Sequence, residues 1–293
     1  MLATAIGLVV GLARLSANWL VARLASVYVE SVRNVPLLLQ LFFWYTVITT
    51  LLPAAAQALH PLPGVVLSKS GLQFAVPSGD PVYGYMVIAL LLGIGAAVAY
   101  DRHARRRQEV TGRAPQRLWP CLALIVGLPL AVWLIGGAPM SFDVPRRETF
   151  RYVGGVAVTP EFLALLLGLS IYTAGFIAEV VRSGILSVPW GQTEAARALG
   201  LRPGMVTRLV VLPQALRVIV PPLTGQYLNL VKNSTLAVAI GYPDLVSVST
   251  TALNQTGQAI ECVTVIMAVY LAISLAIAAF MNWYNKRVAL VER

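Results

Sequence analysis

Long apolar runs are the feature that most constrains how this chain can fold. Six of them approach the roughly 20 mostly apolar residues that a helix needs to cross a bilayer. Of the 293 residues, 58% are hydrophobic and only 12% are charged. This exceeds what one water-soluble core can bury, so we predict an all-α integral membrane protein. The predicted spans are Leu37–Leu59, Gly84–Tyr100, Leu118–Ala138, Glu161–Val181, Pro222–Val246 and Cys262–Tyr284.

The N-terminal part of the chain does not fit this pattern. Met1–Leu15 is apolar but too short for a span, and we interpret it as the end of a helix that begins upstream. In Leu15–Pro36, apolar residues recur at helical spacing with charged residues between them. This pattern is compatible with an interfacial helix, and equally with a continuation of the first helix that bends into the next. The start of the chain lacks a basic region and a cleavage site, so we predict no signal peptide.

Basic side chains are distributed unequally between the loops. The net charge is +10, but the arginines lie between apolar runs, which indicates topology signals rather than nucleic-acid binding. Seventeen basic residues lie before the first span, after the second, after the fourth and after the last, against four on the opposite side. The positive-inside rule therefore predicts that segment 182–221 and the C-terminus are cytoplasmic. The loops His60–Tyr83 and Pro139–Pro160, rich in Pro, Gly and Ser, are then external.

Segment 182–221 contains two short helical patterns between the fourth and fifth spans. The first is Gln192–Leu199, for which Thr193 offers an N-cap and Gly200 a stop. The second, Met205–Val220, contains Pro213, which must kink or end a helix. Neither helix enters lipid in this interpretation, so we expect a protein partner to dock there.

The spacing of residues in this segment resembles the loop signature of ATP-binding-cassette importer permeases. That pattern is Glu-Ala-Ala, three residues, Gly, nine residues, an aliphatic residue, one residue and Leu-Pro. Its positions in this chain are Glu194, Ala195, Ala196, Gly200, Val210, Leu212 and Pro213. Stretches similar to the polar-amino-acid branch of the family are Glu30 to Leu38, Glu179 to Ile185, Pro213 to Arg217, Pro221–Pro222 and Lys232 to Leu236. Lys232–Val246 and Asn254–Glu261 resemble one of the two permease subunits of general L-amino-acid uptake systems.

The resemblance implies a type I importer transmembrane domain over residues 1–293. It implies about six full spans, a partial N-terminal span and an extra helical hairpin at 84–138, which the simplest family members lack. It further implies a permease that forms half of the pathway of an ATP-driven L-amino-acid importer in the bacterial cytoplasmic (inner) membrane. The Glu-Ala-Ala loop would be a coupling helix seated on a separate ATPase. The implied partners are ATPase subunits, a homologous second permease and an external solute-binding protein.

The chain itself offers no site for ATP. A phosphate loop needs Gly-x4-Gly-Lys-Ser/Thr, and none of the three lysines, Lys69, Lys232 and Lys286, follows a glycine. ATP and Mg²⁺ must therefore bind to partner subunits, and we expect this chain to hold no cofactor and to have no catalytic residues. Cys121 and Cys262 lie in separate apolar runs without histidine neighbours, so no metal site or disulfide is expected.

Polar residues within the spans indicate a substrate path. Lys232, Asn233, Ser234 and Thr235 are consecutive, so part of this stretch must be unwound or packed against polar groups. Many relatives carry Asp where this chain has Asn233, which weakens any acid-specific role there. Glu179 precedes Arg182 by one helical turn. The sequence is compatible with two roles for Glu179, a structural ion pair with Arg182 and a contact with the ammonium group of the substrate. Asn233, Ser234 and Thr235 are candidate donors to a carboxylate, and Tyr172, Thr173 and Asn229 are further candidates for the same path.

Two other classes of function are compatible with a polytopic chain. An ion-coupled secondary amino-acid carrier would explain the polar break at Lys232 but leaves the cytoplasmic segment without a role. A membrane-embedded enzyme would need clustered nucleophiles, bases or metal ligands, and the chain has only two histidines, both in loops. The importer permease is therefore the leading hypothesis.

Overall fold

The computed structural model describes residues 1–111, 116, 118–148 and 152–288, and only the backbone of 105, 109–111 and 287–288. Arg113, Arg117, Arg151 and Arg293, which entered the topology count, lie outside the described residues. The chain divides into two compact units. Unit 1 comprises Met1–Ala54, Ser68–Gly71 and Val158–Arg293, and unit 2 comprises Ala55–Leu67 and Leu72–Ala157.

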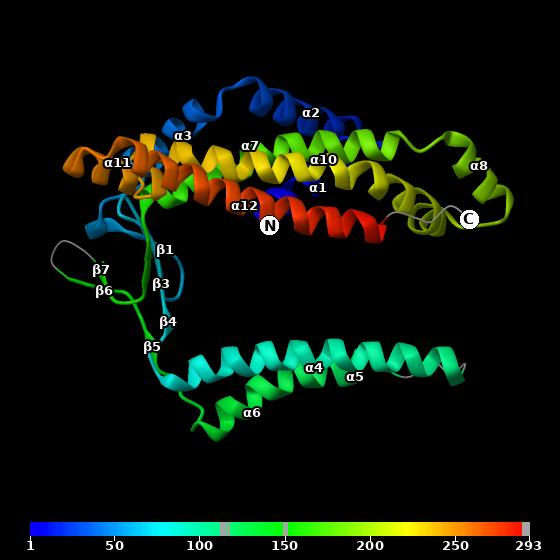
Figure 1. Cartoon of the computed structure of the whole chain (residues 1–293), viewed down its shortest axis with the longest axis horizontal. Helices are drawn as coiled ribbons and strands as arrows, with labels where there is room; N and C mark the ends of the chain where they lie inside the picture. Colours follow the sequence, from blue (N-terminus) through cyan, green and yellow to red (C-terminus); the bar gives the residue numbers. More distant parts are fainter. Residues whose placement is uncertain (112–115, 117, 149–151, 289–293) are drawn as a thin grey trace. The chain divides into compact units, whose positions relative to one another are not determined.

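Unit 1 is helical (Figure 1). In chain order it contains α1 (Leu2–Ala13), α2 (Trp19–Asn34), α3 (Leu37–Thr46) with the π-helical turn η1 (Val47–Leu51), α7 (Pro160–Leu186), α8 (Trp190–Ala198), α9 (Pro203–Val206) with the π-helical turn η4 (Thr207–Val211), α10 (Leu212–Asn233) with the 3₁₀ segment η5 (Ser234–Ile240), α11 (Leu245–Thr256) and α12 (Ala259–Val288).

Five segments of the described chain are long and apolar enough to cross a bilayer. A sixth is added when two helices that meet at an angle of 105° are counted as one span. The five are Pro81–Gln108, Leu118–Ile135, Pro160–Leu186, Pro203–Ile240 and Ala259–Lys286, and the bent pair is Trp19–Asn34 with Leu37–Leu51. The expected fold class is therefore confirmed, and α1 corresponds to the short apolar helix predicted at the N-terminus.

Two predicted spans end too late. The span predicted over Leu37–Leu59 is helical only to Leu51, because Pro53 cannot donate the next backbone hydrogen bond, and Leu59 already lies in a strand. The span predicted over Pro222–Val246 instead begins in the helix that starts at Leu212 and ends at Ile240. The chain then turns, and the Asp244 side chain caps α11 by accepting a hydrogen bond from the Ser247 amide, at 2.8 Å.

The α2 segment is a separate helix, not a continuation of α1. The Asn18 side chain accepts hydrogen bonds from the Leu20 and Val21 amides and so caps a new helix. At the other end, Pro36 keeps Val35 extended, which forces the sharp bend into α3. The buried Gln40 amide donates to the Val32 and Val35 carbonyls, both at 2.9 Å, and thereby satisfies the end of α2.

Small residues allow the helices of unit 1 to pack closely around α7. A Cβ built on Gly11 of α1 would lie 2.8 Å from the Ala178 carbonyl oxygen, and one built on Gly184 would lie 2.3 Å from Ile219 of α10. Since lipid provides no hydrophobic drive between spanning helices, such close backbone approach is what holds them together. A buried cluster of Ala3, Ile177, Val181, Ala215 and Ile219 joins α1, α7 and α10.

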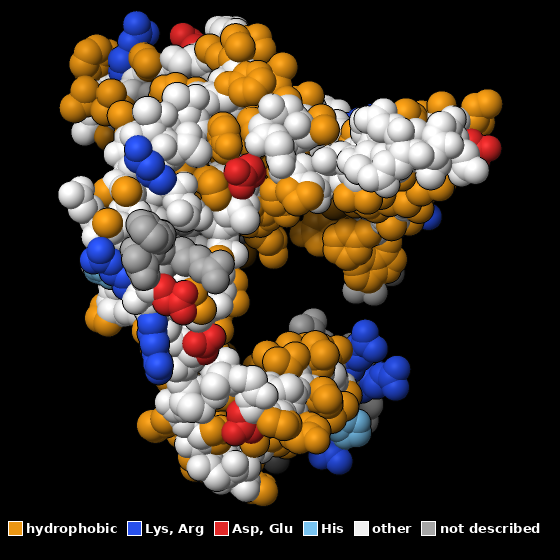
Figure 2. All heavy atoms as spheres, turned by 90° about the vertical axis from the view of Figure 1, so that its left-hand side faces the viewer, with side chains coloured by type: hydrophobic (Ala, Val, Ile, Leu, Met, Phe, Trp, Pro, Cys, Tyr) orange, Lys and Arg blue, Asp and Glu red, His pale blue; other side chains and the backbone are white. Residues whose placement is uncertain are grey.

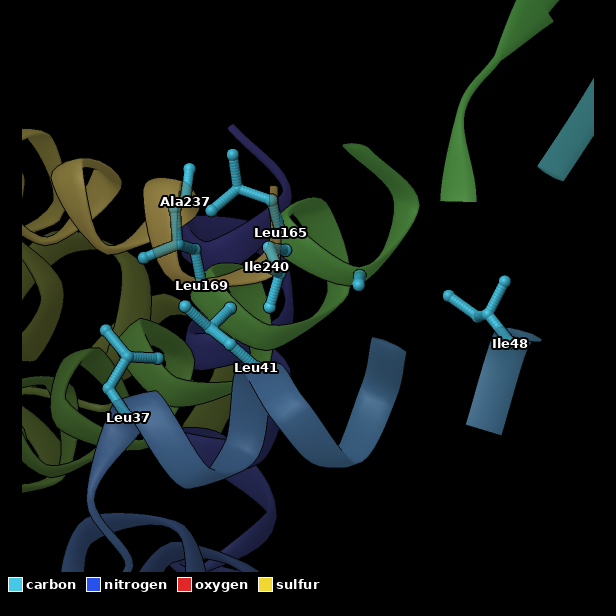
Figure 3. Close-up of a cluster of buried hydrophobic side chains, with 8 residues drawn as sticks. Leu37, Leu41, Ile48, Leu165, Leu169, Ala237 and Ile240 are labelled. Carbon is cyan, nitrogen blue, oxygen red and sulfur yellow. The ribbon is translucent and has the colours of Figure 1, made fainter. Parts of the chain in front are cut away.

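A second buried cluster lies at the other end of α7. Figure 3 shows Leu37 and Leu41 of α3 beside Leu165 and Leu169 of α7 and Ile240 of η5, with side chains directed toward one another. The complete cluster is Leu37, Leu41, Ile48, Ala164, Leu165, Leu169, Ala237 and Ile240. Through Ala237 and Ile240 it packs the 3₁₀ segment η5, which begins at Ser234 within the polar stretch, against the central helix α7.

Unit 2 contains strands, which the all-α prediction did not foresee in the predicted loops. It is built around α4 (Pro81–Thr111), which packs against α6 (Leu128–Ile135) and, more briefly, against α5 (Leu118–Leu122) and the π-helical turn η3 (Ala123–Gly127). A 3₁₀ turn η2 (Ala55–Gln57) precedes the strands. These are β1 (Leu59–Leu62), β2 (Val65–Ser68), β3 (Gly71–Phe74), β4 (Val76–Pro77), β5 (Phe142–Asp143), β6 (Arg146–Arg147), β7 (Tyr152–Val153) and β8 (Val156–Val158).

The strands form a four-stranded sheet in the order β1-β2-β3-β8 and the two-stranded pairs β4-β5 and β6-β7. The β4-β5 pair is antiparallel, with Val76 opposite Asp143 and Pro77 opposite Phe142. Apolar side chains, orange in Figure 2, are mixed there with basic and acidic side chains, because that view faces the side on which the strands of the predicted loops lie. Leu91 and Leu92 of the hairpin are each more than half exposed.

Candidate coupling segment and intramembrane polar site

The segment that follows α7 begins with the nine-residue helix α8. Pro189 occupies its N-cap position and Thr193 lies inside it, so the prediction that Thr193 caps this helix is wrong. The predicted stop at Gly200 is confirmed: this glycine has φ = +77°, a left-handed conformation that other residues adopt at a cost. The Gly200 amide donates to the Arg197 carbonyl at 2.9 Å and the Leu201 amide to the Ala196 carbonyl at 3.2 Å.

The exposed face of α8 carries an ordered set of three side chains. The Trp190 indole donates to a Glu194 carboxylate oxygen at 2.8 Å, and the Arg197 guanidinium lies 5.5 Å from the centre of the Trp190 ring. Trp190 remains 64% exposed, whereas Ala196 on the opposite face is buried. Glu194 therefore orients a large aromatic side chain that points away from the protein's own core.

The chain returns to the spanning helix through α9 and η4. Leu212 and Pro213 open α10, but Pro213 does not end the helix: Pro203–Ile240 is one helical segment, in which the π-helical turn Thr207–Val211 precedes Leu212. Proline is tolerated in the first turn of a helix because its missing N–H has no partner there. The second predicted helix, Met205–Val220, therefore lies within a segment long and apolar enough to span a bilayer, so the expectation that it stays out of lipid is wrong. The helix α8 packs against η4. The two halves of the segment form one folded substructure.

Glu179 lies on α7 among three arginines. Arg182 on the same helix donates to its carboxylate at 2.7 Å, Arg14 after α1 forms a further ion pair, and the Arg33 guanidinium at the end of α2 lies 3.6 Å away. Arg33 also lies over the Phe176 ring, with 5.3 Å to its centre. The ion-pair interpretation of Glu179 is therefore confirmed. Among the described residues its ion pairs and hydrogen bonds go to arginines, not to residues 232–235.

The other candidates on α7 lie close to the protein core. Thr173 is buried. Tyr172 lies beside Phe176, with ring centres 5.0 Å apart and ring planes tilted by 53°, and packs against the buried cluster that contains Leu37 and Leu41. Asn229 lies on the exposed side of α10, one helical turn before Lys232. The structure therefore separates the candidates into an α7 group around Glu179 and an α10 group around Lys232.

The polar stretch 232–235 is not extended. The α-helix continues to Asn233 and then tightens into the 3₁₀ segment η5. The Ser234 hydroxyl donates to the Val231 carbonyl at 2.7 Å, and the Thr235 hydroxyl donates to the Lys232 carbonyl at 2.8 Å. The stretch is thus not unwound, contrary to the first of the two predicted alternatives. The hydroxyls of Ser234 and Thr235 are satisfied by backbone carbonyls of the same helix.

Lys232 and Thr235 line a cavity of about 470 Å³ together with Tyr270, Leu271 and Ser274 of α12. Sequence reasoning did not identify Tyr270 and Ser274. The available signal was two hydroxyl residues four positions apart in an apolar span, which places them on one helix face. In the described part of the chain no three His, Cys, Asp or Glu side chains gather as metal ligands would.

Comparison with known proteins identifies relatives over nearly the whole chain. A general L-amino acid transport system permease protein, AapQ, of Rhizobium johnstonii is 52% identical, covering 99% of this chain and 73% of the relative. A putative amino-acid ABC transporter permease protein, YhdX, of Escherichia coli is 50% identical, covering 99% of this chain and 74% of the relative. A glutamate/glutamine/aspartate/asparagine transport system permease protein, BztB, of Rhodobacter capsulatus is 41% identical, covering 96% and 73%.

A solved structure shares the fold. The crystal structure of an amino acid ABC transporter with histidines superposes with a TM-score of 0.53 and 20% identity, covering 98% of this chain and 87% of that one. The model of the binding-protein-dependent transport system inner membrane component family matches residues 114–290. With this match and the 52% identical relative, the chain belongs to the permeases of binding-protein-dependent transport systems, the family of ABC importer inner membrane components.

Proposed function

We propose that the chain is a permease subunit of an ATP-driven L-amino-acid importer and forms half of its translocation pathway. The names of three relatives, each at least 41% identical over 96% or more of this chain, describe permeases for amino acids. Membership of the family supports the same assignment. Relatives of this kind are transport subunits, so the chemistry of ATP hydrolysis belongs to separate ATPase subunits that hold ATP and Mg²⁺.

The observation that carries the proposal is the helix α8 with its stop at Gly200, which lies between the spanning segments Pro160–Leu186 and Pro203–Ile240 and exposes Trp190. We propose that Glu194, Ala195, Ala196, Gly200, Leu212 and Pro213 form the coupling element seated on an ATPase. Its internal hydrogen bonds and its packing on η4 allow it to move as one body, and η4 continues directly into α10. A movement of the ATPase would therefore be passed to the helix that carries Lys232.

The remaining partners follow from the same architecture. A homologous second permease supplies the other half of the pathway and a second coupling segment, and an external solute-binding protein delivers the substrate. In this orientation the C-terminus and the connection between the spanning segments Pro160–Leu186 and Pro203–Ile240, which is shorter than the predicted segment 182–221, face the cytoplasm of a bacterium, and the chain lies in its inner membrane. The strand β6, with exposed Arg146 and Arg147, then faces the solute-binding protein's side. Residues 84–138 are an added hairpin within one transmembrane domain.

We propose that the α10 group lines the path of the amino acid, with Lys232, Asn233, Ser234, Thr235 and Asn229 as its polar side chains. The α7 group of Glu179, Tyr172 and Thr173 borders the same path, and Glu179 acts chiefly through its ion pairs. An ion-coupled secondary carrier gains no support, because the three relatives are named as permease proteins of transport systems, one of them an ABC transporter.

Reconstituted uptake with defined subunits tests the proposal. Proteoliposomes that contain both permeases, the ATPase and the solute-binding protein should take up L-amino acids, and removing any one component should stop uptake. Uptake that persists without ATP but disappears with the ion gradient would instead identify an ion-coupled carrier.

The coupling segment is tested by replacing Glu194 with Ala and Gly200 with Val. We expect ATPase association and uptake to fall at least about tenfold, the effect of losing about 1.4 kcal/mol of interface free energy. Gly191→Ala is the matched control, because a Cβ at that position of α8 meets no atom within 4 Å. Normal pumping by the double variant, with the ATPase still bound, would refute the coupling assignment.

A further inference from the structure

An open cavity, of whose lining Lys232 and Leu271 are exposed, lies between α10 with η5 on one side and α12 on the other, two helices that pack against each other (Figure 1). Its volume is about 470 Å³, within the range of about 300–1,000 Å³ that small-molecule sites occupy. Each helix contributes residues from one face: Lys232 and Thr235 are three positions apart, and Tyr270 and Ser274 are four apart. Leu271 completes the lining.

The position of the cavity along α12 places it deep in the membrane. Tyr270 and Ser274 lie near the middle of a helix that runs from Ala259 to Val288 and qualifies as a spanning segment over most of its length. Phospholipid headgroups lie at the ends of such a helix rather than at its middle. A ligand of this cavity is therefore a small solute rather than a lipid phosphate.

The lining contains one cationic side chain and no acidic one. Lys232 forms no ion pair with any described residue. Because an ammonium group at membrane depth is energetically costly, such residues are rare and usually mark a functional site. The hydroxyls of Tyr270 and Ser274 are additional donors on the facing helix. The Thr235 hydroxyl already donates to the Lys232 carbonyl, so toward a ligand it can act only as an acceptor.

We infer that Lys232, Tyr270 and Ser274 bind the carboxylate of the transported amino acid within the membrane, and that Thr235 accepts a hydrogen bond from its ammonium group. This inference rests on the proposed import of L-amino acids. Three donors on two helices match an anion with two oxygens, and a charge-assisted hydrogen bond is stronger than a neutral one. Every L-amino acid carries this carboxylate. Such a site therefore binds the part that all substrates share and does not discriminate between substrate side chains.

The inference is tested on the assembled complex in phosphatidylcholine nanodiscs, without the solute-binding protein, by binding of radiolabelled L-glutamine. Lys232→Met should weaken binding by about tenfold or more, the effect of losing a charge-assisted hydrogen bond, and Lys232→Arg should retain most of it. Tyr270→Phe and Ser274→Ala should each weaken binding by about two- to tenfold, as expected for the loss of one hydroxyl donor. Tyr284→Phe, near the end of α12 and outside the cavity, should leave binding unchanged.

Competition with L-glutaminamide, which lacks the carboxylate, separates recognition of charge from a structural role. The unaltered complex should discriminate strongly against the amide, and Lys232→Met should discriminate much less. If Lys232→Met lowers the amount of assembled complex while the remaining complex keeps its affinity and its discrimination, the lysine is structural and the inference is wrong. If instead the unaltered complex neither binds nor transports any amino acid, the proposed function fails.

Discussion

At the scale of single residues, Glu179 joins three separate parts of the chain. Its carboxylate contacts arginines that follow α1, end α2 and belong to α7 itself. The Arg14 side chain is only 12% exposed, so its charge depends on this partner for stabilisation. Removing one member of a largely buried ion pair leaves the other charge without compensation, which costs more than the pair itself contributes.

Glu179→Gln should therefore lower the free energy of unfolding by about 1–3 kcal/mol, because the neutral amide cannot balance the arginines. Thermal unfolding of the complex in detergent measures this change. Uptake should be slower with an unchanged KM, and the ATPase subunits should stay bound, since the coupling segment is a separate substructure. Glu161→Gln, at the other end of α7, is the matched control. An unaltered unfolding temperature for Glu179→Gln would contradict this role.

At the scale of elements, the contact between α1 and α7 depends on the absence of side chains. Gly7 of α1 lies against Ile177, and Gly11 lies against Ala178 and Val181. The two helices run in the same direction, because later residues of α1 meet later residues of α7. This parallel packing brings Arg14 to the level of Glu179, so the helix contact and the ion pair depend on each other.

Gly11→Val should separate α1 from α7, since even a Cβ would lie 2.8 Å from a backbone oxygen that cannot move aside. We expect a loss of about 2–4 kcal/mol in stability, a lower yield of assembled complex and weaker protection of Arg14 from chemical modification. Gly225→Ala provides the control, because that glycine of α10 has open space around its Cβ position. Equal yields for the two variants would show that α1 does not pack as described.

At the scale of the whole molecule, the two units differ in how their helices are stabilised. Both buried clusters identified in the described chain lie in unit 1. Of the apolar stretch by which α7 qualifies as a span, 61% is buried inside the protein. The spans of unit 2 are mostly exposed: 17% of the apolar stretch of Pro81–Gln108 is buried, and none of that of Leu118–Ile135. The proposed coupling helix α8 and the helices that line the polar cavity, α10 with η5 and α12, all lie in unit 1.

Replacing residues 84–138 by a short Gly/Ser linker should leave ATPase binding and ATP-dependent uptake intact. The ends of the deleted part are close together, since the Tyr83 hydroxyl donates to the Pro139 carbonyl at 2.7 Å and the Ser78 amide to the Ser141 carbonyl at 2.9 Å. Removing two spans preserves the orientation of those that follow. Quantitative Western blotting of purified membranes, ATPase pull-down and uptake measure the outcome. Failure of the shortened chain to insert or to bind ATPase would show that the hairpin belongs to the essential fold.

The sequence by itself determined the membrane class, most of the spanning segments and the Glu-Ala-Ala motif for which we propose a coupling role. Apolar length and arginine placement are local properties of the chain, and lipid imposes them whatever the neighbouring helices are. The end of α8 at Gly200 and the pairing of Glu179 with Arg182 were likewise predictable from the sequence, because both depend on residues within one helical turn of each other.

Only the tertiary structure decided what meets across elements. Arg14 is distant from Glu179 in the sequence, and Tyr270 joins Lys232 only because α12 packs on α10. The short strands of unit 2 also escaped prediction, because two- to four-residue strands carry no periodic signal and are stabilised by their pairing partners. The contacts between helices depend on how the helices pack, and in lipid this packing follows from the fit of small residues and not from the hydrophobic pattern.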